Sequence, residues 1–240
     1  MREKWLGFPL PPAYSEASFL FLSATGRDPG TRQWPVEPER QGEIAIDKIR
    51  SRLEASGVPL DNVVRTSFYY RNREVMASMG EVRRRALGVE KRPASASLML
   101  FRFDDHEQLL EIEATALLPR GWSFQKQVVE FDPPRVYCDA VVVGPYVFLS
   151  GAGGVGSTPQ EQARDALRNI QPRLEKKGTS LDNAFLISFY VPGEEHISHV
   201  RQVCHEFRLP QRLPIVTSVV SGYARDEMKV EVEVSALVPR

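Results

Sequence analysis

The chain has 240 residues, and its 31 Lys and Arg side chains balance 31 Asp and Glu side chains, so its formal net charge is zero. This balance offers no basic surface for nucleic acid. No stretch approaches the roughly 20 apolar residues that span a bilayer, and two cysteines do not make a disulfide framework. Since the N-terminus lacks an apolar run of signal-peptide length, we expect a soluble, cytoplasmic protein.

The first half predicts strands that alternate with two helices. Apolar residues recur at helical spacing in both helices, and Gly57 ends the first one. The second helix carries Arg83, Arg84 and Arg85, which we expect to point mostly outward as a solvated face rather than a phosphate site. The expected helices span residues 41–53 and 74–87, and the expected strands span residues 13–26, 62–70, 95–103 and 109–118.

The second half predicts the same order with clearer boundaries. Thr158 and Glu161 form a capping box, with Pro159 at the first helical position, which is a strong helix start. Pro172 lies within the apolar stripe of this helix and is expected to kink it or end it early. A second helix is expected at residues 194–207, and the strands span residues 136–150 (a pair turning at Gly144), 184–191, 216–220 and 228–238.

The two halves repeat one another. Residues 110–120, LEIEATALLPR, return as residues 230–240, VEVEVSALVPR. A repeat of roughly 120 residues has the size of a whole domain. We therefore predict an α+β protein of two tandem domains, residues 1–120 and 135–240, joined by a linker at 121–134. Each domain is a mixed sheet with two helices on one face.

These repeated motifs, in this order, resemble those of the Rid family, the reactive intermediate deaminases of the YjgF-like superfamily. The resemblance covers almost the whole chain, twice. It implies two Rid-like (chorismate-mutase-like) domains, trimers with inward-facing sheets, and ligand clefts between domains. It also implies hydrolysis of enamines and imines to a keto acid and ammonia, without a cofactor. The matching words are Tyr14, 22–23, Gln41, 60–62 and 110–113 in the first half, and Tyr137, 147–151, 162–164, 181–183 and 230–233 in the second.

The sequence departs from the family at the arginine that clamps the substrate carboxylate. This arginine normally follows a Pro-Ala pair, and here Ser95 and Val216 stand at its place in the two halves. Neither side chain supplies the charge of a bidentate guanidinium, so we expect an altered substrate. The replacement arginines to consider are Arg92, Arg201 and Arg212.

The second half keeps Tyr137, Ser150 and Glu231 at the family's spacing. The resemblance implies a cleft in which Glu231 is the acid or base, Tyr137 a wall or donor, and Ser150 a positioning hydroxyl. The same three residues fit purely structural roles about equally well. The further substrate-binding residues that we predict are Tyr14, Ser23, Ser95, Glu111, Arg201 and Val216.

Two other patterns favour structural interpretations. Residues 151–156 fit the dinucleotide pattern GxGxxG, yet the first half lacks it and the surrounding order is not βαβ. His196 and His199 share one side of a helix while His205 points nearly opposite, so we expect no metal site.

Three functions remain open from the sequence. The leading one is an enamine or imine hydrolase of altered specificity; the second is a chorismatase-like or other specialised-metabolism enzyme. The third is a non-catalytic binding or assembly protein, which the missing arginines favour and the intact Tyr137, Ser150 and Glu231 oppose. The neutral charge argues against a nuclease. We expect a small-molecule substrate, no nucleic-acid or membrane partner, and a homotrimer.

Overall fold

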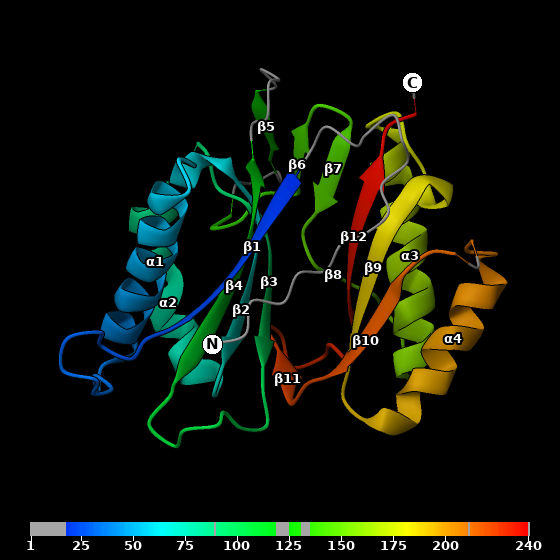
Figure 1. Ribbon diagram of the computed structural model, residues 1–240. Helices are drawn as coiled ribbons and strands as arrows, with labels where there is room; N and C mark the ends of the chain where they lie inside the picture. Colours follow the sequence, from blue (N-terminus) through cyan, green and yellow to red (C-terminus); the bar gives the residue numbers. More distant parts are fainter. Residues whose placement is uncertain (1–17, 89, 119–124, 131–134, 211, 240) are drawn as a thin grey trace.

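The computed structural model contains two β-sheets that face one another, each covered on its outer side by two helices (Figure 1). It describes residues 18–88, 90–118, 125–130, 135–210 and 212–239. The predicted α+β class, with helices on one face of each mixed sheet, is confirmed. We call residues 18–118 the first unit and residues 125–239 the second unit.

The sheet of the first unit has the strand order β1-β4-β2-β3-β11. Strands β2 and β3 are parallel because helix α2 carries the chain between them, and the other pairs are antiparallel. The last strand, β11 (Gly222–Tyr223), comes from the second unit and pairs with β3, a pairing that the sequence did not predict. The other elements are β1 (Ser18–Thr25), α1 (Pro38–Ala55), β2 (Val63–Tyr70), α2 (Arg73–Leu87), β3 (Ala94–Met99) and β4 (Leu110–Leu118).

The sheet of the second unit has the order β10-β9-β12-β7-β6-β5, with β8 also paired to β12. Helix α3 begins at the predicted capping box, passes Pro172 and ends one turn later. Four residues of the stretch expected as a linker form β5, which pairs with β6. The elements are β5 (Lys126–Val129), β6 (Ala140–Val143), β7 (Tyr146–Leu149), β8 (Ala152–Gly153), α3 (Pro159–Glu175), β9 (Ala184–Val191), α4 (Ile197–Glu206), β10 (Ile215–Val219) and β12 (Glu231–Leu237).

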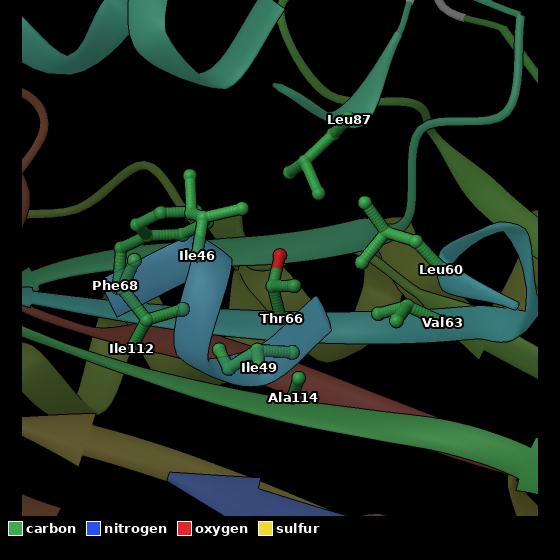
Figure 2. A pocket seen from close by; sticks show the side chains of 9 residues that line it. All are labelled: Ile46, Ile49, Leu60, Val63, Thr66, Phe68, Leu87, Ile112 and Ala114. Atoms are coloured by element: carbon green, nitrogen blue, oxygen red, sulfur yellow. The ribbon is translucent and has the colours of Figure 1, made fainter. Parts of the chain in front are cut away.

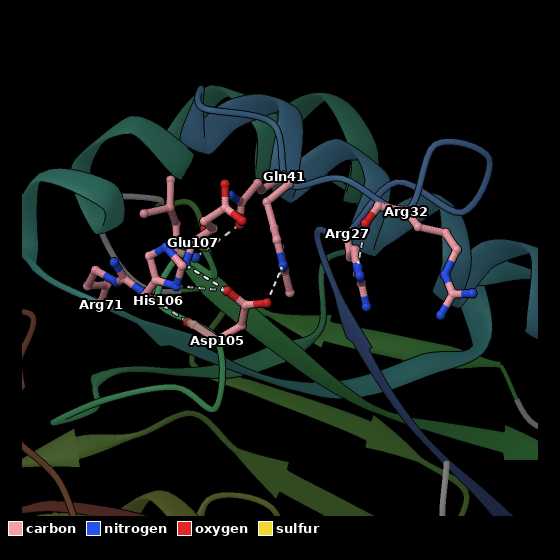
Figure 3. A network of polar contacts seen from close by, with 9 residues as sticks. Arg27, Arg32, Gln41, Arg71, Asp105, His106 and Glu107 are labelled. Atoms are coloured by element: carbon pink, nitrogen blue, oxygen red, sulfur yellow. Dashed lines mark hydrogen bonds and ion pairs between the residues drawn. The ribbon is translucent and has the colours of Figure 1, made fainter.

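A repeated glutamine holds each unit together. Gln41, at the start of α1, donates from Nε2 to the carbonyls of Pro35 (2.7 Å) and Glu107 (2.9 Å) and accepts the Leu109 N–H through Oε1 (3.0 Å) (Figure 3). Gln162 in α3 makes the corresponding backbone hydrogen bonds in the second unit. This glutamine motif of the family therefore holds a loop and the closing strand rather than a ligand. Its partners are Gly156, Glu227 and Lys229.

The two units share an apolar core and a buried ion pair. The Phe19 ring of β1 meets the Tyr146 and Phe148 rings of β7 edge to face, at centroid distances of 5.1 and 5.9 Å. Arg65 of β2 pairs with the fully buried Glu233 of β12 at 2.8 Å. Since breaking a buried ion pair leaves an uncompensated charge, this contact fixes how the sheets face each other.

The arginine run of α2 does not form a single solvated face, which corrects the expectation for its first member. Arg84 and Arg85 are exposed, but Arg83 is buried. The reason is helical geometry, because residue 83 lies four positions after the buried Met79 and so shares its face. The spacing from Met79 to Arg83 already indicated a buried position, but the usual preference of arginine for solvent favoured the opposite prediction.

Candidate functional site

The two units meet along the part of β3 that precedes its pairing with β11, where two of the predicted site residues contact each other. The Ser95 N–H donates to the Ser150 hydroxyl (2.8 Å), which donates in turn to the carbonyl of Cys138 (2.6 Å). The Gly151 N–H donates to the carbonyl of Ser95 (3.1 Å). Ser150 is fully buried, so its hydroxyl joins the backbones of the two units.

Glu231, the predicted acid or base, lies beside this contact at the start of β12. Its side chain is only 4% exposed, and its carboxyl group accepts the backbone N–H of Ser97 from the first unit. Gly151 lies directly against it, because a Cβ there would stand 1.8 Å from Glu231 Oε1. The glycine is therefore required by this close approach.

The environment of Glu231 shifts its protonation into the neutral range. Burial, and to a smaller extent the negative charge of Glu233, raise the pKa of Glu231 to about 8. The Ser97 hydrogen bond and the charge of Arg225 oppose the shift. Glu233 is paired with Arg65, whereas no ion pair of the described residues includes Glu231. Glu231 is thus a neutral acid at pH 7 that can give and take a proton.

Arg225 is a cation near Glu231 that sequence reasoning missed. It lies between β11 and β12, and its Nη2 is 3.3 Å from the place that a Cβ on Gly153 would take. Gly153 is the ladder partner of Glu231. The Arg225 side chain is 61% exposed and its Nε is 3.4 Å from Glu227. Nothing in the local sequence marks this position, since the contact depends on how β8 and β12 pair.

Tyr137 lies near the interface between the units, and Ser23 and Glu111 of the first unit lie on the inner face of the first sheet. Tyr137 is half-buried, precedes Cys138, and accepts a hydrogen bond from Arg135 at 3.2 Å. Ser23 donates to Glu111 Oε1 at 2.5 Å on the inner face of the first sheet, away from the Ser95–Ser150 contact. Tyr14 lies outside the described residues.

Two predicted substrate-binding residues are not brought to Glu231. Val216 is 46% exposed on β10, and β9 separates that edge strand from β12. Helix α4 lies in the outer helix layer (Figure 1), and Arg201 is exposed on it, whereas Glu231 accepts the backbone N–H of Ser97 from the first unit. Of the suggested replacement arginines, Arg92 is buried and paired with Glu130.

The glycine-rich loop at residues 151–156 is packed against its own helix. A Cβ on Gly154 would stand 2.0 Å from the Gln162 carbonyl oxygen of α3. Asp165 accepts the Val155 N–H, and Glu161 accepts the N–H groups of the two residues before α3. Carboxylates of the chain thus occupy the donors that a phosphate would use. Among the described residues, no group of three or more His, Cys, Asp or Glu side chains is placed to hold a metal ion.

A small cavity lies in the core of the first unit, between the helices and the sheet (Figure 2). Its volume is about 10 Å³, and Thr66 supplies its one hydroxyl among apolar side chains such as Ile46, Phe68 and Leu87. A space of this size holds at most one water molecule, so it is no substrate pocket.

Several solved structures are similar to this chain. The chain superposes on a chorismatase structure with a TM-score of 0.62 and 19% identity, over 92% of this chain and 75% of the chorismatase. A YjgF-family protein from Mycobacterium tuberculosis is 28% identical, and the match covers 48% of this chain and 100% of that protein. A YjgF-family protein from Neisseria meningitidis is 22% identical, and the match covers 48% of this chain and 97% of that protein. The TM-score is 0.43 in both cases. No curated protein matches the chain significantly.

Across the described residues, no helix combines the length and apolar character that crossing a membrane requires.

The profile of the family described as Endoribonuclease L-PSP matches residues 12–118 and again residues 128–238. Since the two matches cover most of the sequence, the chain belongs to the Endoribonuclease L-PSP (YjgF/Rid) family as a tandem of two Rid-like domains.

Proposed function

We propose that the chain is a small-molecule enzyme whose site lies between the two units and hydrolyses enamine or imine intermediates. The observation that carries this proposal is Glu231, a buried carboxyl group with its pKa near 8 at the unit interface. A general acid or base works best when its pKa lies near the operating pH.

The chemistry needs one group that gives a proton and takes one back. The neutral Glu231 carboxyl protonates the enamine carbon, which leaves an iminium ion and a carboxylate. Water then adds to the iminium carbon and returns its proton to Glu231, and the resulting carbinolamine loses ammonia to give the carbonyl product. The Ser97 N–H, which already binds the carboxyl group, stabilises its charged form between these steps.

The substrate differs from that of the family's ordinary deaminases in this proposal. The strand positions Ser95 and Val216 carry no charge, and Ser95 is engaged through its backbone with Ser150 and Gly151. Arg225 is the exposed cation beside Glu231, so it would meet an anionic substrate group on the open side of the site. The protein would act in the cytoplasm as a homotrimer.

The test is a comparison of Glu231→Gln with wild type on 2-aminoacrylate generated by a cysteine lyase. Glutamine keeps the shape of the side chain but cannot transfer a proton. A fall in turnover of 100-fold or more is expected, the lower end of the range for general acid-base catalysis. Glu54→Gln, an exposed carboxylate on α1, is the matched control and should act as wild type. Equal turnover in Glu231→Gln and wild type would refute the assigned role.

A chorismatase-like activity is the second candidate, because the fold matches a chorismatase over nearly the whole chain. Incubation with chorismate separates the two enzymes, since pyruvate release without ammonia would identify this activity. Turnover of neither compound would favour the third candidate, a binding or assembly protein. The Endoribonuclease description of the family gains no support from a formal net charge of zero.

A further inference from the structure

Arg83 is a buried cation that no carboxylate of the described residues neutralises. Its side chain, on α2, is 6% exposed. Nη1 donates to the Ser97 hydroxyl (3.0 Å) and Nη2 to the Ser95 hydroxyl (2.9 Å), and the guanidinium carbon lies 4.2 Å from the Phe68 ring centroid. Nε has no hydrogen-bond partner in the described part of the chain.

Such a group is costly in a protein interior. A guanidinium has five N–H donors and no acceptor, and a buried charge is normally paired. Neutral hydroxyl groups and an aromatic face offset only part of the lost hydration. The arrangement therefore lacks an acceptor with negative charge.

A second buried donor points to the same need. Tyr70 is fully buried on β2, and its hydroxyl lies within reach of Arg83 and Ser97 without a hydrogen bond of good geometry among the described residues. Burial raises the pKa of Tyr70, while the charge of Arg83 and side-chain contacts with Arg83 and Ser97 oppose the shift. The Thr66 hydroxyl adds to the cluster by donating to Ser95 Oγ at 3.2 Å. Hydroxyl and guanidinium donors thus lie close together between α2 and β3.

The second unit shows that the fold does not need this cluster. At positions 121 residues later, Arg83 is replaced by a cysteine, and the threonine, tyrosine and first serine by aliphatic side chains. The Phe68 position keeps its phenylalanine, so the surrounding core is otherwise similar. The replacing residues are Ile187, Val191, Cys204 and Val216. A cluster present in one unit alone suggests a role beyond packing.

We propose that Arg83, Ser95, Ser97 and Tyr70 form a binding site for one small monovalent anion. The ligand is the size of a halide or a single carboxylate group, and the guanidinium Nε and the Tyr70 hydroxyl donate to it. The side chains of this site lie on the helix-covered side of β3, whereas the backbone N–H groups of Ser95 and Ser97 contact Ser150 and Glu231.

The first test measures thermal unfolding in sodium chloride or sodium formate against sodium gluconate at equal ionic strength, since gluconate is too large to enter. A ligand that binds only the folded chain raises its melting temperature with concentration. Wild type should respond to chloride or formate, and Arg83→Met should not. The control is Arg85→Met, which removes an exposed arginine from the same helix and should keep the response.

The two anions distinguish the source of the ligand, because a larger effect of formate indicates a carboxylate and a larger effect of chloride indicates a free halide. Absence of any response in wild type, or an equal response in Arg83→Met, would overturn the proposal. If Arg83→Met fails to fold, wild-type crystals soaked in sodium bromide decide the matter. Anomalous scattering should then place bromide within hydrogen-bond distance of Arg83 Nε, and a site that holds no bromide in these crystals and no formate in crystals soaked in sodium formate would overturn the proposal.

Discussion

The protonation of Glu231 predicts how the stability of the protein depends on pH. In the unfolded chain a glutamate ionises near its ordinary pKa of 4.5, whereas burial between the units raises the pKa of Glu231 to about 8. The folded state therefore holds one extra proton between these values. The resulting stabilisation is fully present below pH 4.5 and is lost as the pH rises through 8.

The magnitude follows from the shift. Each pKa unit corresponds to about 1.4 kcal/mol, so a shift from 4.5 to about 8 amounts to about 5 kcal/mol across this range. This is comparable to the whole free energy of unfolding of many domains. The change should therefore be measurable without great precision.

The perturbation is Glu231→Gln, which keeps the volume of the side chain and removes its titration. Urea unfolding at pH 5, 7 and 9 gives the free energy of unfolding of both proteins. The stability of wild type relative to Glu231→Gln should fall by several kcal/mol from pH 5 to pH 9, and the variant should be the more stable protein at pH 9. The exposed Glu54→Gln on α1 should follow wild type throughout. Parallel curves for wild type and Glu231→Gln would refute the burial argument.

Three further predictions concern packing, capping and assembly. Gly151→Ala should displace Glu231 and abolish activity, because the Cβ of the alanine would overlap the Glu231 carboxyl group. Gly80→Ala, at an α2 position with free space around it, should instead raise the free energy of unfolding in urea by about 0.5–1 kcal/mol. Activity in Gly151→Ala equal to wild type would contradict this. Thr158→Ala should lower the free energy of unfolding by about 1 kcal/mol, because the hydroxyl caps α3; an unchanged midpoint would count against the cap. Light scattering should report a mass near three chains, and a monomer at all concentrations would defeat the trimer proposal.

The elements themselves could be predicted because each depends on local spacing. Strand β9 has the predicted limits, and α3 starts at the predicted capping box, since a hydroxyl, a proline and a glutamate fix a helix start within four residues. Helix α3 also continues one turn past Pro172, although the proline removes one intrahelical hydrogen bond, so the expected early end is wrong.

The site could be predicted only in part. The family motifs pointed to Glu231 and Ser150, and the motif that departs from the family pointed to Ser95; the structure places the three residues at the contact between the units, and their roles in catalysis are proposals. Arg225 was missed, because it reaches Glu231 only through the pairing of β8 with β12. Arg83 was assigned to solvent because the run of three arginines outweighed its place on the apolar face of α2.

The sequence alone determined the tandem repeat, the fold of each unit and the family, since these rest on patterns that recur along the chain. Only the tertiary structure decided that β11 crosses to the other sheet and that Ser95 meets Ser150. It also decided that Glu231 is buried and Arg83 lacks a carboxylate partner among the described residues. Burial and charge balance depend on which side chains from distant segments surround a group, and spacing along the chain does not encode that surrounding.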